Sequence, residues 1–327
     1  MYDYGLSTLE QYSLTAVKSS RTRGALLCNT EKGLFILKEF RGSEKKLSYQ
    51  QKLLLHLKEQ GFLVDVYLEN QEGSLVSRDK DGIPYTLQYY QEGKECDPRA
   101  KVDLRKSIGH LAQLHNAMRL EPAEDYVEMP LEEVYIRHNQ ELRKIRKFIR
   151  KKGPGNAFEK DYFYSAEWFI DKAEEALSAL LASSYDKLRK KALMQGCICH
   201  GEYNQHNVWL TRQGIAVTNF GHWGFDMQIS DLYCFLRKIM EKHGWDVELA
   251  RELLGIYHRY KTITPEEWIN LKIRFSYPEK YWKLANYYYA HNKAWISEKN
   301  IEKMKVLLAQ KEQWEQFIEK CFSYYPF

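Results

Sequence analysis

The sequence predicts an α+β protein with a β-rich N-terminal lobe and a larger, mainly helical C-terminal lobe. Short apolar and β-branched runs separated by turn residues fill the region from about residue 10 to residue 95. Beyond it, long segments carry apolar residues at helical spacing. At 327 residues the chain can bury two cores. We place the lobes at 1–93 and 94–327, with a helical insert in the second at about 121–195.

The N-terminal lobe is predicted to hold several strands around one helix. Polar residues at 29–33, ending in glycine, indicate a turn between two β-rich runs. Ser43 can cap a helix that continues to Gln60, where Gly61 supplies the stop. The strands expected in this lobe lie at 17–18, 25–28, 34–37 and 85–90.

The C-terminal lobe is predicted from helical periodicity. Gly153-Pro154-Gly155-Asn156 separates two long helical patterns, and Thr264-Pro265 and Tyr277-Pro278 interrupt the later ones. We expect helices at 102–118, 131–152 and 164–192, and further helices from Asp231 to the C-terminus.

Composition argues for an intracellular protein with reduced thiols. The 49 Lys and Arg exceed the 44 Asp and Glu by only five, too few to indicate nucleic-acid binding. The six cysteines have no zinc-like or Cys-x-x-Cys spacing. The N-terminus lacks a signal-peptide pattern, and no apolar run is long enough to span a membrane. We therefore expect a cytosolic location, no membrane partner and no nucleic-acid partner.

The most informative motif runs from residue 199 to residue 207 and reads Cys-His-Gly-Glu-Tyr-Asn-Gln-His-Asn. Short apolar runs on either side of Gly214 indicate a hairpin after it, and Asn-Phe-Gly follows at 219–221. This order would place Glu202, Asn207 and Asn219 at strand ends that face one site. A phosphotransferase needs a carboxylate to orient the attacking hydroxyl and oxygen ligands for Mg²⁺. The pattern therefore indicates a kinase-like centre.

Other motifs accompany this centre from about residue 37 to residue 238. They are Leu37-Lys38, Arg41-Gly42-Ser43-Glu44, Gln91-Glu92-Gly93-Lys94-Glu95, Leu111-Ala112-Gln113-Leu114-His115 and Asp231-Leu232-Tyr233-Cys234-Phe235-Leu236-Arg237-Lys238. In these motifs and their order the chain resembles the aminoglycoside-phosphotransferase-like kinases and, within them, the spore coat protein S family. The resemblance implies a two-lobed protein-kinase-like fold of the aminoglycoside-phosphotransferase type.

The resemblance also implies a nucleotide site with ATP and Mg²⁺ as cofactors. Lys38 would bind the phosphates, and Glu44 is the expected carboxylate partner of this lysine. Adenine would bind at the hinge, where Gln88 and Tyr90 are the candidate residues. Residues 19–24 would form the loop that covers the nucleotide, without a Gly-x-Gly-x-x-Gly motif.

The implied catalytic residues are Glu202, His200 and Asn207. Asn207 and Asn219 would be the metal ligands, and Asp231, at the start of a helix, would cap backbone N–H groups and hold the loop. His200 would brace the loop by hydrogen bonds.

Two positions depart from the resembled pattern, which reads His-Gly-Asp, then Asn, then Asp-Phe. Glu202 keeps a carboxylate, but its extra methylene moves the oxygens by roughly one ångström, and such a displacement can cost on the order of 100-fold in rate. Asn219 brings no charge to offset Mg²⁺. Asp226 is the alternative acid for this position. The sequence thus predicts a degraded metal site.

A second feature is a basic amphipathic helix between Arg137 and Lys152, with eight Lys or Arg and one Glu. A solvated helix face explains most such patterns. The alternative is docking of an acidic partner or of an anionic substrate.

We therefore expect a spore-coat-associated pseudokinase or scaffold, made in the mother-cell cytoplasm and then located in the spore coat, with other coat proteins as partners. The alternative is an active ATP-dependent phosphotransferase for a hydroxyl of an amino alcohol, a sugar or an aminoglycoside-like molecule. Its ligand would be small and either anionic or hydroxylated.

Overall fold

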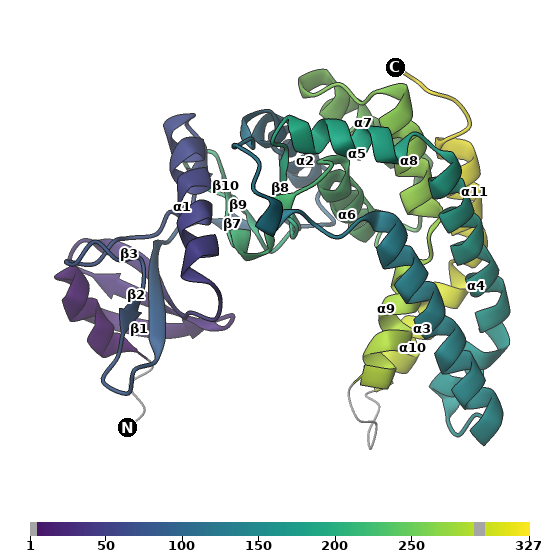
Figure 1. Cartoon of the computed structure of the whole chain (residues 1–327), viewed down its shortest axis with the longest axis horizontal. Coiled ribbons are helices and arrows are strands. Elements are labelled where there is room, and N and C mark those ends of the chain that lie inside the picture. The colour runs from purple at the N-terminus through teal and green to yellow at the C-terminus, as the bar shows by residue number, and fades with distance from the viewer. Residues whose placement is uncertain (1–4, 291–297) are drawn as a thin grey trace. The chain divides into compact units, whose positions relative to one another are not determined.

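The computed structural model describes residues 5–290 and 298–327, and its contacts divide the chain into two compact units. Unit 1 comprises Met1–Tyr126 with Gly196–Phe225, and unit 2 comprises Val127–Gln195 with Asp226–Phe327. These units are defined by the contacts within each of them and do not test the boundary between the two lobes, so the boundary expected at residue 93 stays a prediction. Figure 1 shows strands gathered in the first unit and helices in the second, as the sequence predicted.

Unit 1 is built on a five-stranded antiparallel sheet in the order β1-β2-β3-β6-β5. The β2–β3 pairing centres on Cys28 opposite Phe35, which bury their side chains in a core with Leu37 and Leu87. Its strands are β1 (Ala16–Thr22), β2 (Ala25–Thr30), β3 (Gly33–Glu39), β5 (Ser77–Arg78) and β6 (Pro84–Tyr89), preceded by the 3₁₀ helix η1 (Leu6–Tyr12).

Two helices and two smaller sheets complete unit 1. Ser43 caps α1 (Glu44–Glu59) by accepting a hydrogen bond from the Lys46 N–H at 3.4 Å, as expected. The second helix is α2 (Lys101–Ala117), and η2 (Glu124–Tyr126) and η3 (Phe220–His222) are 3₁₀ turns. One sheet has the order β4-β10-β9-β7 and the other pairs β11 with β8. These strands are β4 (Leu63–Val64), β7 (Lys94–Glu95), β8 (Ile198–Cys199), β9 (Val208–Leu210), β10 (Ile215–Val217) and β11 (Gly224–Phe225).

Unit 2 is helical over the residues that the structure describes. One core of unit 2 lies among α3, α4, α9, α10 and α11, where the aromatic rings of Tyr162 and Tyr281 stack with 5.1 Å between ring centres. The helices are α3 (Leu131–Lys152), α4 (Ala157–Ala182), α5 (Tyr185–Met194), α6 (Ile229–Met240), α7 (Val247–Tyr260), α8 (Pro265–Ser276), α9 (Glu279–Ala290), α10 (Glu298–Ala309) and α11 (Lys311–Cys321).

The helix expected at 164–192 is two helices. α4 begins earlier, at Ala157, because Asn156 caps it by accepting a hydrogen bond from the Glu159 N–H at 3.0 Å. It ends at Ser183, whose hydroxyl donates to the Leu180 carbonyl at 2.7 Å, and α5 follows. Serine competes for backbone hydrogen bonds in this way and so favours helix ends.

Two other boundaries differ from expectation. α6 begins at Ile229, so Asp231 lies inside its first turn, where a carboxylate interacts favourably with the helix dipole. Ser19 to Thr22 belong to strand β1 and not to a loop, because the β1–β2 register runs to Thr22 opposite Ala25. The covering loop is therefore reduced to the Arg23-Gly24 turn.

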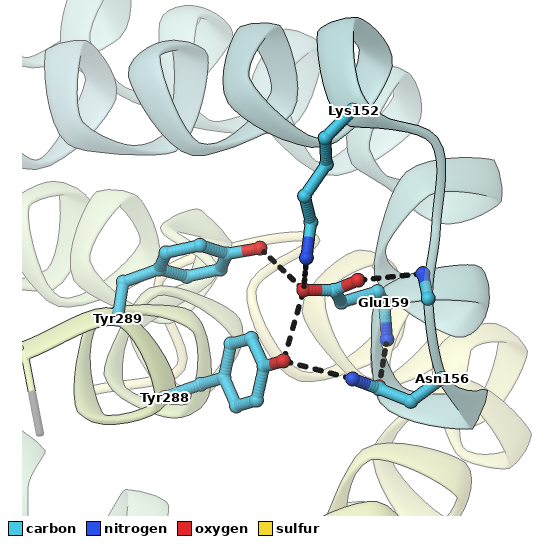
Figure 2. A network of polar contacts seen from close by, with 6 residues as sticks. Lys152, Asn156, Glu159, Tyr288 and Tyr289 are labelled. Atoms are coloured by element: carbon cyan, nitrogen blue, oxygen red, sulfur yellow. Dashed lines mark hydrogen bonds and ion pairs between the residues drawn. The ribbon is translucent and has the colours of Figure 1, made fainter. Parts of the chain in front are cut away.

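The turn between α3 and α4 is tied to α9 by the buried carboxylate of Glu159. Figure 2 shows the Lys152 ammonium, 2.6 Å away, and the Tyr288 and Tyr289 hydroxyls converging on one oxygen. The Gly155 N–H donates to the other oxygen at 2.7 Å. Burial raises the pKa of Glu159, but the hydrogen bonds outweigh it and hold this pKa below its usual value. The ionised group therefore stabilises the turn.

Other features bear on the expectations from composition. The six cysteines are free, and five of them are buried. Two basic residues of the amphipathic helix, α3, form ion pairs with acidic residues of α4. Arg143 lies 3.0 Å from Glu174, and Arg146 lies 2.9 Å from Glu167. These ion pairs favour the interpretation of α3 as a helix with a solvated polar face, for the part of the helix that they cover.

In the part of the chain that the structure describes, no helix has both the length and the apolar character of a membrane span.

Candidate functional site

Two strand pairings in unit 1 bring the 199–207 motif against the 219–221 motif. β9 and β10 form the expected hairpin, and β11 returns to pair with β8, so Gly224 lies opposite Cys199. The two segments touch at Gly201, which has a φ of +78°. A β-carbon there would lie 2.0 Å from the His222 carbonyl oxygen, so only glycine permits this approach.

The segment after Asn219 is also anchored to α1. The buried Trp223 ring stacks on Tyr49 with 5.7 Å between ring centres and 12° between planes. The Lys46 ammonium lies 5.4 Å from the centre of the Trp223 ring. These contacts fix the backbone that follows the candidate metal ligand.

His200 is fully buried and holds the loop from inside. Its Nδ1 accepts a hydrogen bond from the Glu202 N–H at 3.1 Å, and its Nε2 lies 3.1 Å from the Thr218 carbonyl oxygen. An acceptor at Nδ1 and a donor at Nε2 define the neutral Nε2–H tautomer. His200 therefore links the loop to the end of β10.

Glu202 and Asn207 are held together through the loop backbone. The Asn207 side-chain amide donates to the Glu202 carbonyl at 2.9 Å, and the Asn204 amide donates to the same oxygen. The Asn207 carbonyl in turn accepts from the Thr218 N–H at 2.9 Å. The Glu202 side chain is 43% exposed, so solvent and a bound molecule can both reach it.

Asn219 makes the contact that defines the site. Its backbone is left-handed, with φ 65° and ψ 54°, a conformation that Asn tolerates better than most residues. Its side-chain amide donates to Glu202 Oε2 at 3.3 Å. His222 Nε2 lies 3.8 Å from the other oxygen, Oε1. The candidate catalytic carboxylate thus faces an amide donor and an imidazole.

Asp65, which was not predicted from the sequence as a site residue, contacts the backbone of Asn219. Its Oδ2 accepts the Asn219 backbone N–H at 2.8 Å, and the Gln88 amide donates to its backbone carbonyl at 2.7 Å. Oδ1 is buried and has no hydrogen-bond partner among the described residues. Burial raises the pKa of Asp65 to about 7, although the Asn219 N–H and the Lys38 charge act in the opposite direction.

The residues predicted for nucleotide binding have separate surroundings. Lys38 lies on β3 opposite Thr86, with its charge close enough to favour ionisation of Asp65. Glu44 lies at the exposed start of α1 and contacts Arg78 at 3.5 Å, and no contact joins it to Lys38. Among the described residues, the Lys38 charge therefore favours ionisation of Asp65, and Glu44 forms no ion pair with Lys38.

The two candidate hinge residues differ in burial. Gln88 is buried, and its side-chain amide donates a hydrogen bond to the Asp65 backbone carbonyl. Tyr90 is partly buried and meets the edge of Trp209 with 6.0 Å between ring centres, while its N–H donates to the Leu34 carbonyl. Tyr90 alone of the pair retains part of its side chain at the surface.

The β1–β2 hairpin is tied to the 199–207 loop by charge. Arg23, at the hairpin turn, contacts Glu95 Oε1 at 2.8 Å, and His206 Nδ1 lies 2.9 Å from Glu95 Oε2. These exposed pairs are worth little individually, about 0–1 kcal/mol each. They nevertheless place the hairpin turn beside the candidate catalytic loop.

The donor set does not fit a resident Mg²⁺. Mg²⁺ prefers carboxylate oxygens, yet Glu202 Oε2 is engaged by the Asn219 amide and Asp65 Oδ2 by the Asn219 N–H. Within residues 5–290 and 298–327, no three Asp, Glu, His or Cys side chains gather closely enough to hold a metal ion. Asp226, the alternative acid, lies in unit 2 and contacts Arg189 at 3.4 Å.

Asp65 and His222 have different sequence signals. Asp65 is an acid inside the apolar run Phe62-Leu63-Val64-Asp65-Val66, which can be noticed but not assigned to a partner. His222 follows Asn219 closely, so the predicted turn could have suggested that it faces the loop.

Comparison with known proteins gives matches over nearly the whole chain. The model of the family described as "Spore coat putative kinase YutH" matches residues 7–321. The chain is 22% identical over 319 residues to spore coat protein S of Bacillus subtilis strain 168, covering 95% of this chain and 90% of that protein.

Solved structures confirm the kinase-like fold. An aminoglycoside phosphotransferase from Alicyclobacillus acidocaldarius superposes with a TM-score of 0.85 at 17% identity, covering 96% of this chain and 94% of the other. Spectinomycin phosphotransferase in complex with ADP and spectinomycin gives 0.59 at 12% identity, covering 95% and 97%. Amicoumacin kinase in complex with AMP-PNP, Ca²⁺ and Ami gives 0.58 at 14% identity, covering 94% and 89%.

Proposed function

Because the chain belongs to the spore coat putative kinase YutH family, we propose that it is a kinase-like coat component that does not transfer phosphoryl groups. The observation that carries this proposal is the hydrogen bond from the Asn219 amide to Glu202 Oε2. In an active kinase this carboxylate must receive the hydroxyl of the acceptor. Here the chain's own amide already engages one of the two carboxylate oxygens.

The other contacts of the site support the same proposal. Glu202 is the one catalytic-loop carboxylate, and Asn219 supplies no charge where Mg²⁺ would need it. Asn207 uses its amide to hold the loop backbone. The fold would be kept for its surface, which would bind other proteins of the spore coat.

The location in the spore coat is part of the same proposal. It is supported by the family description and by the 22% identity to a spore coat protein. Synthesis in the mother cell would precede assembly on the spore.

The second candidate is an active phosphotransferase that acts on a hydroxyl of an amino alcohol, a sugar or an aminoglycoside-like molecule. It is favoured by one observation, the ordered presentation of Glu202 by His200 and Asn207. Glu202 would then be the base and Lys38 would bind phosphates. ATP would be the donor.

Formation of ADP from ATP tests the proposal against this candidate, because transfer of the phosphoryl group to an acceptor hydroxyl leaves ADP as the second product. We expect wild type, supplied with Mg²⁺ and a panel of hydroxylated acceptors, to form ADP no faster than Glu202→Ala. Loss of a working general base costs about 100-fold or more, so the two outcomes are well separated. Acceptor-dependent ADP formation by wild type about 100-fold above that of the variant would establish the active phosphotransferase.

A further inference from the structure

Unit 2 contains a cavity that plays no part in the site described above. Its volume is about 380 Å³, within the range of small-molecule pockets, which starts at about 300 Å³. It is lined by residues of α4, α6, α8, α9, α10 and α11 and of the segments that follow α6 and α8. All the lining residues belong to unit 2.

The cavity has an aromatic wall. Buried rings form most of it and would cover the apolar body of a bound molecule. They are Phe169, Phe275, Tyr281 and Trp314, with Trp245 beside them. Leu307 of α10 also lines the cavity and packs against the same core.

Charges at the cavity are mainly positive. Six Lys or Arg residues line it against three Glu. The Glu241 carboxylate forms two ion pairs, one with Arg237 and one with Lys280 at 3.4 Å. Lys299 and Lys303 of α10 are exposed and have no ion pair with a described residue. Arg237 is buried, and its Nε has no hydrogen-bond partner among the described residues.

We propose that this cavity binds a small organic anion that has an apolar body and a carboxylate- or sulfonate-type head. The apolar body lies against the aromatic wall, and the head lies at Lys299 and Lys303. A neutral molecule of the same shape can contact the aromatic wall but is not attracted by the lysines. A cation is repelled, because basic residues outnumber acidic residues around the cavity. The proposal is independent of whether the 199–207 loop catalyses phosphoryl transfer.

Two fluorescent probes test it on the full chain. 1-Anilinonaphthalene-8-sulfonate carries a sulfonate, and N-phenyl-1-naphthylamine has the same ring system without charge. We expect the anionic probe to bind one site per chain, about tenfold more tightly than the neutral probe. We expect Lys299→Glu/Lys303→Glu to remove this preference and Leu307→Trp, which fills the cavity, to weaken both probes.

The matched control is Lys305→Glu, since Lys305 is exposed on the same helix but does not line the cavity. This variant should bind both probes as wild type does. Each variant is first shown to unfold at the wild-type temperature. Equal binding of the two probes to wild type would overturn the proposal, as would unchanged sulfonate binding in Lys299→Glu/Lys303→Glu or in folded Leu307→Trp.

Discussion

Asn219→Asp is expected to make the stability of the chain depend on Mg²⁺, whereas the stability of wild type should not change with the metal. The substitution replaces an amide donor by a carboxylate that faces Glu202 Oε2, with 3.3 Å between the corresponding atoms in wild type. Two like charges so close destabilise each other, by about 1–2 kcal/mol after screening at a half-exposed site. A divalent cation bound between them would reverse this loss.

Thermal unfolding with and without millimolar MgCl₂ measures the effect. Asn219→Ala is the control, because it removes the amide donor without adding charge, and it should unfold at the same temperature with and without the metal. If Asn219→Asp were as stable as wild type in a chelator and did not respond to Mg²⁺, the amide would not be what separates this site from a metal site.

Asp65→Asn is expected to stabilise the protein at pH 8, by on the order of 2–4 kcal/mol. Burial raises the pKa of Asp65 to about 7 in the folded chain, against about 3.9 in an unfolded one. Between these values the folded state keeps a proton that the unfolded state has lost, so stability falls as pH rises from about 4 to about 7. Asparagine keeps an acceptor for the Asn219 N–H and removes the charge.

Urea unfolding at a series of pH values checks this expectation. The advantage of Asp65→Asn should be largest above pH 7 and should vanish near pH 4, where both side chains are neutral. Asp81→Asn, on an exposed turn, is the control and should follow wild type throughout. A variant less stable than wild type at pH 8 would show that attraction to Lys38 exceeds the cost of burying the carboxylate.

An acid that costs stability suggests a role in the site. Asp65 accepts a hydrogen bond from the N–H of Asn219, the predicted metal ligand, and its ionisation is favoured by the charge of Lys38, the predicted phosphate ligand. Perturbed carboxyls of this kind gather at functional sites. Glu44, the carboxylate that was expected to pair with Lys38, instead pairs with Arg78.

The local parts of the fold could be predicted because their signals lie in short stretches of sequence. The helix expected at 131–152 has the bounds of α3, and the Thr264-Pro265 break coincides with the cap of α8, where Thr264 accepts from Glu267. The split between α4 and α5 was missed because apolar spacing continues across it. The first helix ends where the N–H and the hydroxyl of Ser183 both donate to the Leu180 carbonyl.

The site could be predicted only where its residues share one segment. The hairpin between 208 and 217 brings Glu202 and Asn219 together, and its turn and strands are visible in the sequence. Asp65 reaches Asn219 from another part of the chain because β4 pairs with β10 in parallel. Neither a motif nor a periodicity indicates that pairing.

The most direct test of the central claim is calorimetric titration of ATP into the full chain, with and without Mg²⁺. The claim is that the Asn219–Glu202 contact has replaced the metal site. It predicts that ATP either does not bind or binds with an affinity that Mg²⁺ changes by less than about threefold. Binding that Mg²⁺ strengthens by about tenfold or more would contradict the claim and would show a working metal site.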